Sequence, residues 1–245
     1  MSSIAVGVPL HNGMSLERNP KTSLMHPGVG YAVFDAQGSI VRLNDRAARI
    51  LFGEGATHEQ FIGLALADLF PDDWVRDRTD AIRRVQTSGK PLLFRSICSG
   101  VQYITWLIPG AAEDGPDGSV VAIMQQVAGS DPIRDLGLQD VPLVEGEVVD
   151  LGPLHTLTPR EVEVLALLGE GMSMKEISQE LGCSLKTAEK HRGALGAKLG
   201  LDDRVKLARM ATFAGLTRRD ARRRRVVVTP PEIVVKRSTV NVGNN

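Results

Sequence analysis

Residues 157–200 read LTPREVEVLALLGEGMSMKEISQELGCSLKTAEKHRGALGAKLG. The pattern predicts three short helices in succession, because apolar residues recur at helical spacing and each segment begins with a capping signal. The first two signals are capping boxes, in which a Ser or Thr and the Glu three residues later satisfy each other's backbone amides. The third segment, 184–199, begins with a lone Ser. The predicted structural caps are Thr158, Glu161, Ser173, Glu176 and Ser184.

The second and third segments are separated only by Gly182 and Cys183, so their helices must cross at a steep angle, as in a helix-turn-helix. One face of the third helix is predicted to point inward and carries Ala188, His191, Leu195 and Leu199. The opposite face carries Lys186, Glu189, Lys190, Gly193 and Ala197. These side chains are polar or short, which suits insertion into a DNA major groove about 12 Å wide. We therefore predict that this helix reads DNA and that the first two hold it in place.

The charge of the chain is unevenly divided. Basic and acidic residues each number 29, so the formal net charge is zero. Residues 1–150 contain 12 basic and 19 acidic residues, a net of −7, and residues 151–245 contain the remaining 17 and 10, a net of +7. A basic C-terminal half is typical of a domain that faces nucleic acid. Two domains of unlike charge with no such partner are the alternative.

The C-terminal stretch resembles the LuxR/GerE-type helix-turn-helix of bacterial transcription regulators in the segments LTPREVEVL, GMSMKEISQELG and CSLKTAEKHRGALGAKLG. The likeness continues through DDRVKLARMATFAGL, which resembles the family's fourth helix, and it implies an all-α four-helix domain over 155–216. The resemblance implies DNA base reading by Glu189, Lys190 and Gly193. It implies phosphate contacts by Lys175, Lys186, Thr187 and Arg192. The chain departs from the family at Ala188, where Val is usual, and at Gly193, which has no side chain to read with.

The N-terminal half has a different order of elements. A strand at 31–34, the turn residues DAQG and a strand at 39–43 predict a hairpin. Asn44 can then cap a helix that ends at Gly53. The next predicted elements are a helix at 73–88 and strands near 91–97, 101–108 and 119–127. One hairpin followed by helices and three antiparallel strands predicts an α+β domain over 28–128.

This order resembles a PAS domain, and the likeness rests on GYAVFDAQGSIVRLN, Ala47, Ala48 and the pair Phe52–Gly53. The resemblance implies an antiparallel sheet with helices that binds a small ligand or cofactor, or that only dimerises. Flavin-adduct members have a Cys on a helix in the region of 61–90, and haem members commonly have a His on the long helix; this chain has neither. The cofactor therefore stays open.

The remaining segments are predicted from composition. Residues 1–27 are rich in turn formers and predict a flexible N-terminal arm. Residues 129–154 predict a linker, because three prolines interrupt any helix there, and a linker would act as a tether between the domains. Residues 217–245 predict a basic, disordered tail, since six arginines fall within 218–225.

These features together favour a transcription regulator whose partners are double-stranded DNA and a second copy of the chain, paired through the apolar strands 101–108 and 119–127. RNA polymerase is left open as a further partner. A sigma-factor-like promoter subunit, a response regulator and a PAS domain with a purely structural role are the alternatives. We expect no enzyme, since the sequence shows no catalytic set, metal cluster or phosphate loop. No stretch approaches the ~18 apolar residues of a membrane span, so we expect a cytoplasmic protein.

Overall fold

The computed structural model describes residues 28–129, 131, 141–201 and 203–229, together with two paired strands of two residues each, β1 (Pro9–Leu10) and β2 (Met14–Ser15). Apart from those strands, the predicted arm over 1–27 lies outside the described residues. The N-terminal elements are β3 (Gly30–Phe34), β4 (Ile40–Leu43), α2 (Asp45–Phe52), η1 (His58–Gln60), α3 (Leu66–Leu69), α4 (Asp72–Ser88), β5 (Leu92–Cys98), β6 (Val101–Pro109) and β7 (Val120–Gln126). The C-terminal elements are β8 (Leu143–Val149), η2 (Gly152–Leu154), α6 (Pro159–Gly169), α7 (Met174–Glu180), α8 (Leu185–Leu199), α9 (Arg204–Ala214), η3 (Asp220–Arg222) and β9 (Arg224–Arg225).

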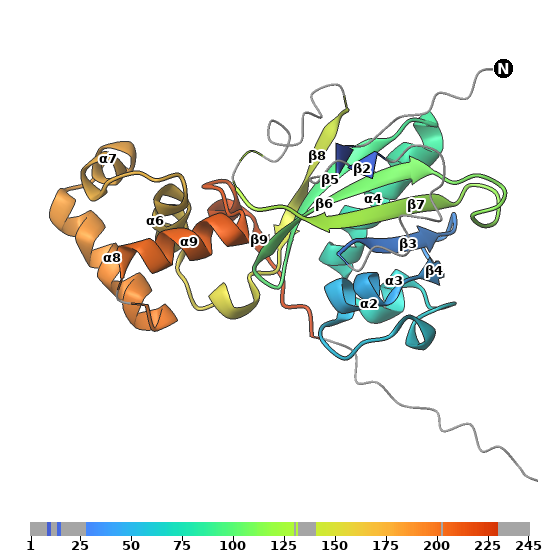
Figure 1. Ribbon diagram of the computed structural model, residues 1–245, viewed down its shortest axis with the longest axis horizontal. Coiled ribbons are helices and arrows are strands. Elements are labelled where there is room, and N and C mark those ends of the chain that lie inside the picture. Colours follow the sequence, from blue (N-terminus) through green and yellow to red (C-terminus); the bar gives the residue numbers. More distant parts are fainter. Residues whose placement is uncertain are drawn as a thin grey trace, which may run out of the picture.

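The N-terminal half folds around one sheet, and the C-terminal half is helical (Figure 1). The strand order of the sheet is β4-β3-β7-β6-β5-β8-β9. The first five strands are antiparallel to their neighbours, whereas β8 runs parallel to β5 and β9 parallel to β8. The prediction of a hairpin, helices and three antiparallel strands is confirmed, and so is the PAS-like α+β fold class with a helical C-terminal domain.

Local signals explain the start of the PAS-like domain. The side chain of Asn44 caps α2 by accepting from the amide of Ala47 at 2.8 Å, and it also accepts from the amide of Tyr31 at 3.0 Å. This one side chain therefore fixes both the helix start and the neighbouring strand. Gly53 ends the helix with φ of 92°, a conformation that residues with a Cβ rarely adopt.

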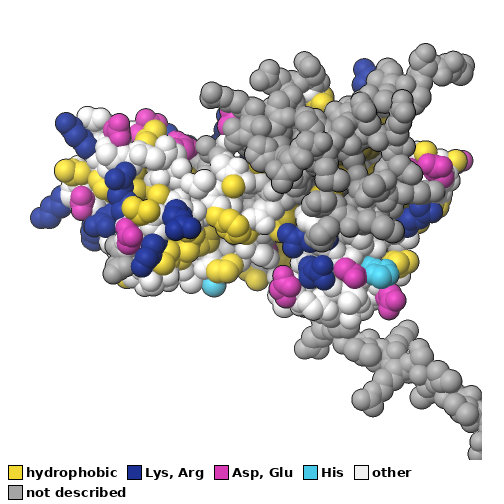
Figure 2. Space-filling view, viewed as in Figure 1, with side chains coloured by type: hydrophobic (Ala, Val, Ile, Leu, Met, Phe, Trp, Pro, Cys, Tyr) yellow, Lys and Arg dark blue, Asp and Glu magenta, His cyan; other side chains and the backbone are white. Residues whose placement is uncertain are grey.

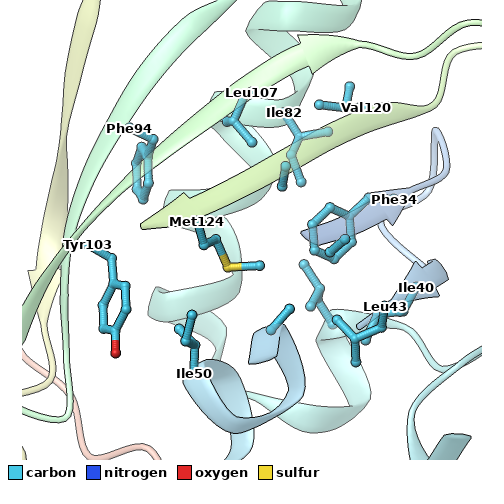
Figure 3. Packing of buried hydrophobic residues seen from close by; sticks show 14 of the residues in the cluster. Phe34, Ile40, Leu43, Ile50, Ile82, Phe94, Tyr103, Leu107, Val120 and Met124 are labelled. Atoms are coloured by element: carbon cyan, nitrogen blue, oxygen red, sulfur yellow. The ribbon is translucent and has the colours of Figure 1, made fainter. Parts of the chain in front are cut away.

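The main core of this domain lies between the sheet and helices α2 and α4. Figure 3 shows apolar side chains of the strands, including Phe34, Leu107 and Met124, pointing toward Ile50 and Ile82 on the helices. Burial of such side chains stabilises a fold by ~1.5–3 kcal/mol each. Stacked aromatic rings close the helical side of this core, with centroids 3.6 Å apart for one pair and 3.8 Å for the other; the pairs are Phe52 with Phe61 and Phe70 with Trp74.

The predicted linker over 129–154 is wrong for residues 143–149, which form β8. This strand pairs with β5 in parallel, Leu93 opposite Leu143 and Ile97 opposite Val149, with a shift of register between Arg95 and Ile97. Val148 and Val149 are 4% and 0% exposed, so the strand contributes apolar side chains to both domains' cores. Prolines exclude a helix here, but a strand can begin directly after Pro142. Residues 130 and 132–140 lie outside the described residues.

The predicted disordered tail is also wrong for residues 217–229. The chain forms η3 and then β9, in which Arg224 and Arg225 pair with Val148 and Val149. The mutual repulsion of the arginines is offset here, because carboxylates face them, most of them from distant parts of the chain. The ion pairs are Arg222 with Glu163, Arg223 with Glu145 and Asp220, and Arg224 with Asp73. Residues 230–245 lie outside the described residues.

The outer face of the sheet, opposite α2 and α4, is apolar and buried. Its largest side chains include Ile104, Trp106, Val121 and Ile123, each 6% exposed or less. Pairing of two copies through strands 101–108 and 119–127 stays a prediction. No helix among the described residues is long and apolar enough to cross a lipid bilayer.

Candidate nucleic-acid interface

Helix α6 is the scaffold of the C-terminal domain. Its N-terminus has a complete capping box, in which the amide of Thr158 donates to Glu161 at 2.7 Å and the amide of Glu161 donates to the Thr158 hydroxyl at 3.3 Å. Six of its apolar side chains are at most 1% exposed, so the helix is surrounded on nearly all sides; they are Val162, Val164, Leu165, Ala166, Leu167 and Leu168. A helix so enclosed holds its neighbours in fixed positions.

The carboxylates of α6 anchor neighbouring segments. Burial alone raises the pKa of Glu161, but hydrogen bonds from Lys198 and Thr158 outweigh it, and the pKa lies below its usual value. Lys198 on α8 lies 2.7 Å from this carboxylate and ties the end of α8 to the start of α6. The same balance lowers the pKa of Glu163, where burial is opposed by hydrogen bonds from Arg160 and Arg222.

The turn between α7 and α8 is short and held from both sides. Helix α7 has its own capping box, with Ser173 and Glu176 bonded at 2.7 and 3.2 Å. Gly182 has φ of 60°, a left-handed conformation that lets the chain reverse in two residues. Arg160 on α6 donates to the carbonyl of Leu181 at 2.6 Å and so fixes the turn on the scaffold.

Helix α8 has one buried face and one open face. The hydroxyl of Ser184 accepts from the amide of Thr187 at 3.1 Å and caps the helix. Ala188 and Leu195 are completely buried, whereas His191 is only half-buried. The residues predicted to point outward are all exposed: Lys186, Glu189, Lys190, Gly193 and Ala197. A Cβ added at Gly193 would meet no atom within 4 Å, so no described residue packs against α8 at this position.

The open face and the neighbouring α7 carry lysines that form no ion pair with any described carboxylate. Among the described residues, no ion pair within 4.0 Å involves Lys175, Lys186 or Lys190. Arg192 is half-buried and lies 3.7 Å from Glu189, which is a weak contact. Figure 2 shows Lys and Arg side chains gathered over the helical end of the molecule, where Figure 1 places α8. The structure thus brings the predicted base-reading and phosphate-contacting residues of α8 together at one end, with Lys175 on the neighbouring α7.

Helix α9 has an exposed stripe that the sequence reasoning did not identify. Val205 and Phe213 are 62% and 58% exposed, and Arg209 lies one turn from each. Two apolar residues two turns apart on the outer face of a predicted helix indicate a contact surface, and this pattern is present in the sequence. Arg204 at the start of α9 donates to the carbonyl of Met172 at 2.8 Å and fixes this helix on the segment before α7.

Three packed helices, a two-residue turn and an open cationic helix define a helix-turn-helix domain. Residues 155–211 match the family model of bacterial regulatory proteins of the luxR family, and this part of the chain is a LuxR-type helix-turn-helix domain. The match covers under a quarter of the chain.

Similar proteins include two curated transcriptional regulators. MctR of Rhizobium johnstonii is 36% identical over 104 residues, which is 42% of this chain and 47% of MctR. UhpA of Escherichia coli is 51% identical over 58 residues, 24% of this chain and 30% of UhpA. The chain thus spans less than half the length of these curated relatives. A solved VqmA–ligand–DNA complex from Vibrio cholera is 21% identical, with 83% of this chain and 92% of that chain covered and a TM-score of 0.44.

Proposed function

We propose that this protein is a cytoplasmic, sequence-specific DNA-binding transcription regulator controlled by its PAS-like domain. The observation that carries the proposal is the exposed, unpaired cationic face of α8, held on a LuxR-type scaffold. The matched relatives are named as transcriptional regulators, which supports this class over an enzyme. A sigma-factor-like subunit fits less well, because the N-terminal half is an α+β sheet domain rather than a helical partner.

Chemistry assigns the contacts within the interface. Lys190 donates to the O6 and N7 acceptors of guanine, and Glu189 accepts from the amino group of cytosine. Gly193 lets the helix backbone approach the base edges. Phosphates are contacted by positive or hydroxyl groups at the rim of the groove: Lys175, Lys186, Thr187 and Arg192.

A single helix of this size reads few base pairs, so we propose that two copies bind adjacent half-sites as a homodimer. The exposed stripe of Val205, Arg209 and Phe213 on α9 supports pairing of the DNA-binding domains. The strands 101–108 and 119–127 are the alternative surface for pairing, and most of their side chains are buried within the single chain.

An apolar cavity of about 50 Å³ in the PAS-like domain supports a sensory role for this domain. The cavity lies between α2, α4 and the sheet. Its walls include Phe94, Tyr103 and Met124, and the guanidinium of Arg78 lies 4.0 Å from the ring centre of Trp74 at one side. A small apolar molecule with a hydrogen-bond acceptor suits this lining. The small volume favours a second candidate, in which the domain has a purely structural role and holds the DNA-binding domain in place.

Replacing Lys175 by Ala should weaken binding to all duplex sequences about equally, because this residue faces phosphate rather than a base. For the full chain, the slope of log affinity against log salt should become shallower by about 1 for each protomer bound. The measurement is a fluorescence-anisotropy titration of duplex DNA at several salt concentrations. Lys90→Ala, an exposed lysine in the PAS-like domain, is the control and should change nothing. Wild-type binding that is independent of salt, or absent for every duplex, would overturn the proposed function.

A further inference from the structure

A buried ion pair joins the two domains. Arg95 on β5 and Asp220 on η3 are separated by 125 residues and form two parallel hydrogen bonds, Nη1 to Oδ1 at 2.9 Å and Nη2 to Oδ2 at 2.7 Å. Their side chains are 1% and 0% exposed. A two-fold contact of this kind fixes direction as well as distance, because the planar guanidinium and the planar carboxylate must be aligned.

Both partners are held by further contacts from their own side. The Nε of Arg95 donates to the side chain of Gln102 on the adjacent strand β6. The carboxylate of Asp220 accepts from the amide of Thr217 at 2.7 Å and from Arg223 at 2.9 Å. The pair therefore joins two arrays that are already ordered, rather than two flexible side chains.

Helix α9 ends directly on this contact. Nη2 of Arg95 donates to the carbonyl of Gly215, the C-cap of α9, at 2.9 Å, where a cation is favoured by the helix dipole. A Cβ at Gly215 would lie 2.7 Å from the Cβ of Gln102, and φ at this residue is 64°. Only glycine allows the helix end to approach the sheet so closely. The amide of Gly129 adds a hydrogen bond to the carbonyl of Thr212 at 2.8 Å.

Strand β5 connects this contact to the cavity of the PAS-like domain. Alternate residues of a strand point to opposite faces of the sheet. Phe94, Ser96 and Cys98 point inward and line the cavity. Arg95 and Ile97 point outward, and Ile97 belongs to the same buried apolar cluster as the side chains of α6. One strand thus provides both a wall of the cavity and the attachment of the DNA-binding domain.

The attachment leaves the reading helix free. In Figure 1, α9 and the segment with η3 lie against the sheet, whereas α8 lies at the opposite end of the helical domain. The ion pair therefore cannot block DNA from α8. What it fixes is the direction in which α8 projects from the sheet.

We propose that Arg95 and Asp220 form an interdomain latch that sets the orientation of α8 relative to the PAS-like sheet, and that the latch prepares two recognition helices of a dimer for two half-sites. Arg95 and Asp220 are positioning residues and do not touch DNA. The latch rests on the proposed function for its effect on DNA binding, but its effect on domain orientation is independent of it.

The test uses Asp220→Asn in the full chain, because this substitution keeps the shape and removes the charge. The DNA probes are a duplex with two half-sites, selected from a random library by the wild-type protein, and a duplex with one of those half-sites. We expect binding to the two-site duplex to weaken about tenfold or more, because the orientation of the two domains is no longer preset, and binding to the single site to change by less than about twofold. Small-angle X-ray scattering without DNA should show a larger radius of gyration.

The control is Arg83→Gln, which removes an exposed ion pair with Asp80 on α4 and should change neither scattering nor binding. Amide hydrogen exchange in α4 and α6 establishes that both domains of the variant are folded, and Arg95→Lys replaces Asp220→Asn if they are not. Unchanged scattering and unchanged two-site binding would overturn the latch, as would unfolding of α6 in both variants. If the wild type selects no duplex from the library, the proposed function is contradicted. The scattering of the wild type and Asp220→Asn still tests, in that case, whether the ion pair sets the orientation of the two domains.

Discussion

Replacing Arg95 by Met is expected to lower the free energy of unfolding by about 3–5 kcal/mol, the usual cost of removing one partner of a buried ion pair. Met is apolar and cannot donate hydrogen bonds, so the loss comes from leaving the Asp220 carboxylate, which is 0% exposed, without its two-fold partner and the buried carbonyl of Gly215 without its donor. Arg223 still lies 2.9 Å from that carboxylate and keeps the loss from being greater. The measurement is equilibrium unfolding in urea, monitored by circular dichroism.

Arg83→Met is the matched control for this variant. Its guanidinium is on the surface, 69% exposed, and surface ion pairs contribute little to stability. The unfolding midpoint of this control should stay at the wild-type value. An Arg95→Met protein as stable as the control would mean that the two domains are not joined through this contact in solution.

Inserting one residue after Gly146 is expected to destabilise the protein by about 3–6 kcal/mol. Side chains alternate along a strand, so a shift of one residue turns the following side chains to the wrong face. Val148 and Val149 are 4% and 0% exposed and would both leave their cores, at about 1.5–3 kcal/mol each. Unfolding in urea and limited proteolysis of the full chain measure the effect.

The matched control is the same insertion between Pro116 and Asp117, in the exposed loop between β6 and β7, which should be tolerated. The sequence alone favours the opposite result at Gly146, since a tether accepts extra residues at little cost. If both insertions are tolerated equally well, residues 143–149 act as a flexible tether and not as a strand of the sheet. That result would contradict the assignment of β8.

The helix-turn-helix could be predicted because its signals are local. Thr158 and Glu161 lie three residues apart, and the two-residue turn at Gly182 and Cys183 constrains the crossing of α7 and α8 without reference to the rest of the chain. The α+β order of the PAS-like domain was predictable for the same reason, because Asn44 and its neighbours mark an element boundary within a few residues.

The strands β8 and β9 could not be predicted, because what stabilises them is far away in the sequence. The residues 143–149 form a strand only because β5 offers an edge for parallel pairing. From the sequence alone, the arginines within 218–225 are predicted to repel one another. In the folded chain, the carboxylates of Asp73 and Glu145 lie beside them and offset that repulsion. The contact of Arg95 with Asp220 spans 125 residues and has no local signature. The DNA contacts remain predictions, since they depend on a partner that lies outside the chain.

The most direct test of the central claim, that α8 reads base pairs, is selection of duplexes from a random library with the wild type and with Lys190→Ala. The wild type should enrich a defined site. The variant should lose its preference at one base pair of each half-site and bind the wild-type site more weakly by about 1–3 kcal/mol per half-site, while the other positions keep their preference. Identical enriched sites and affinities for the two proteins, or no enrichment by the wild type, would contradict the assignment of α8 as the reading helix.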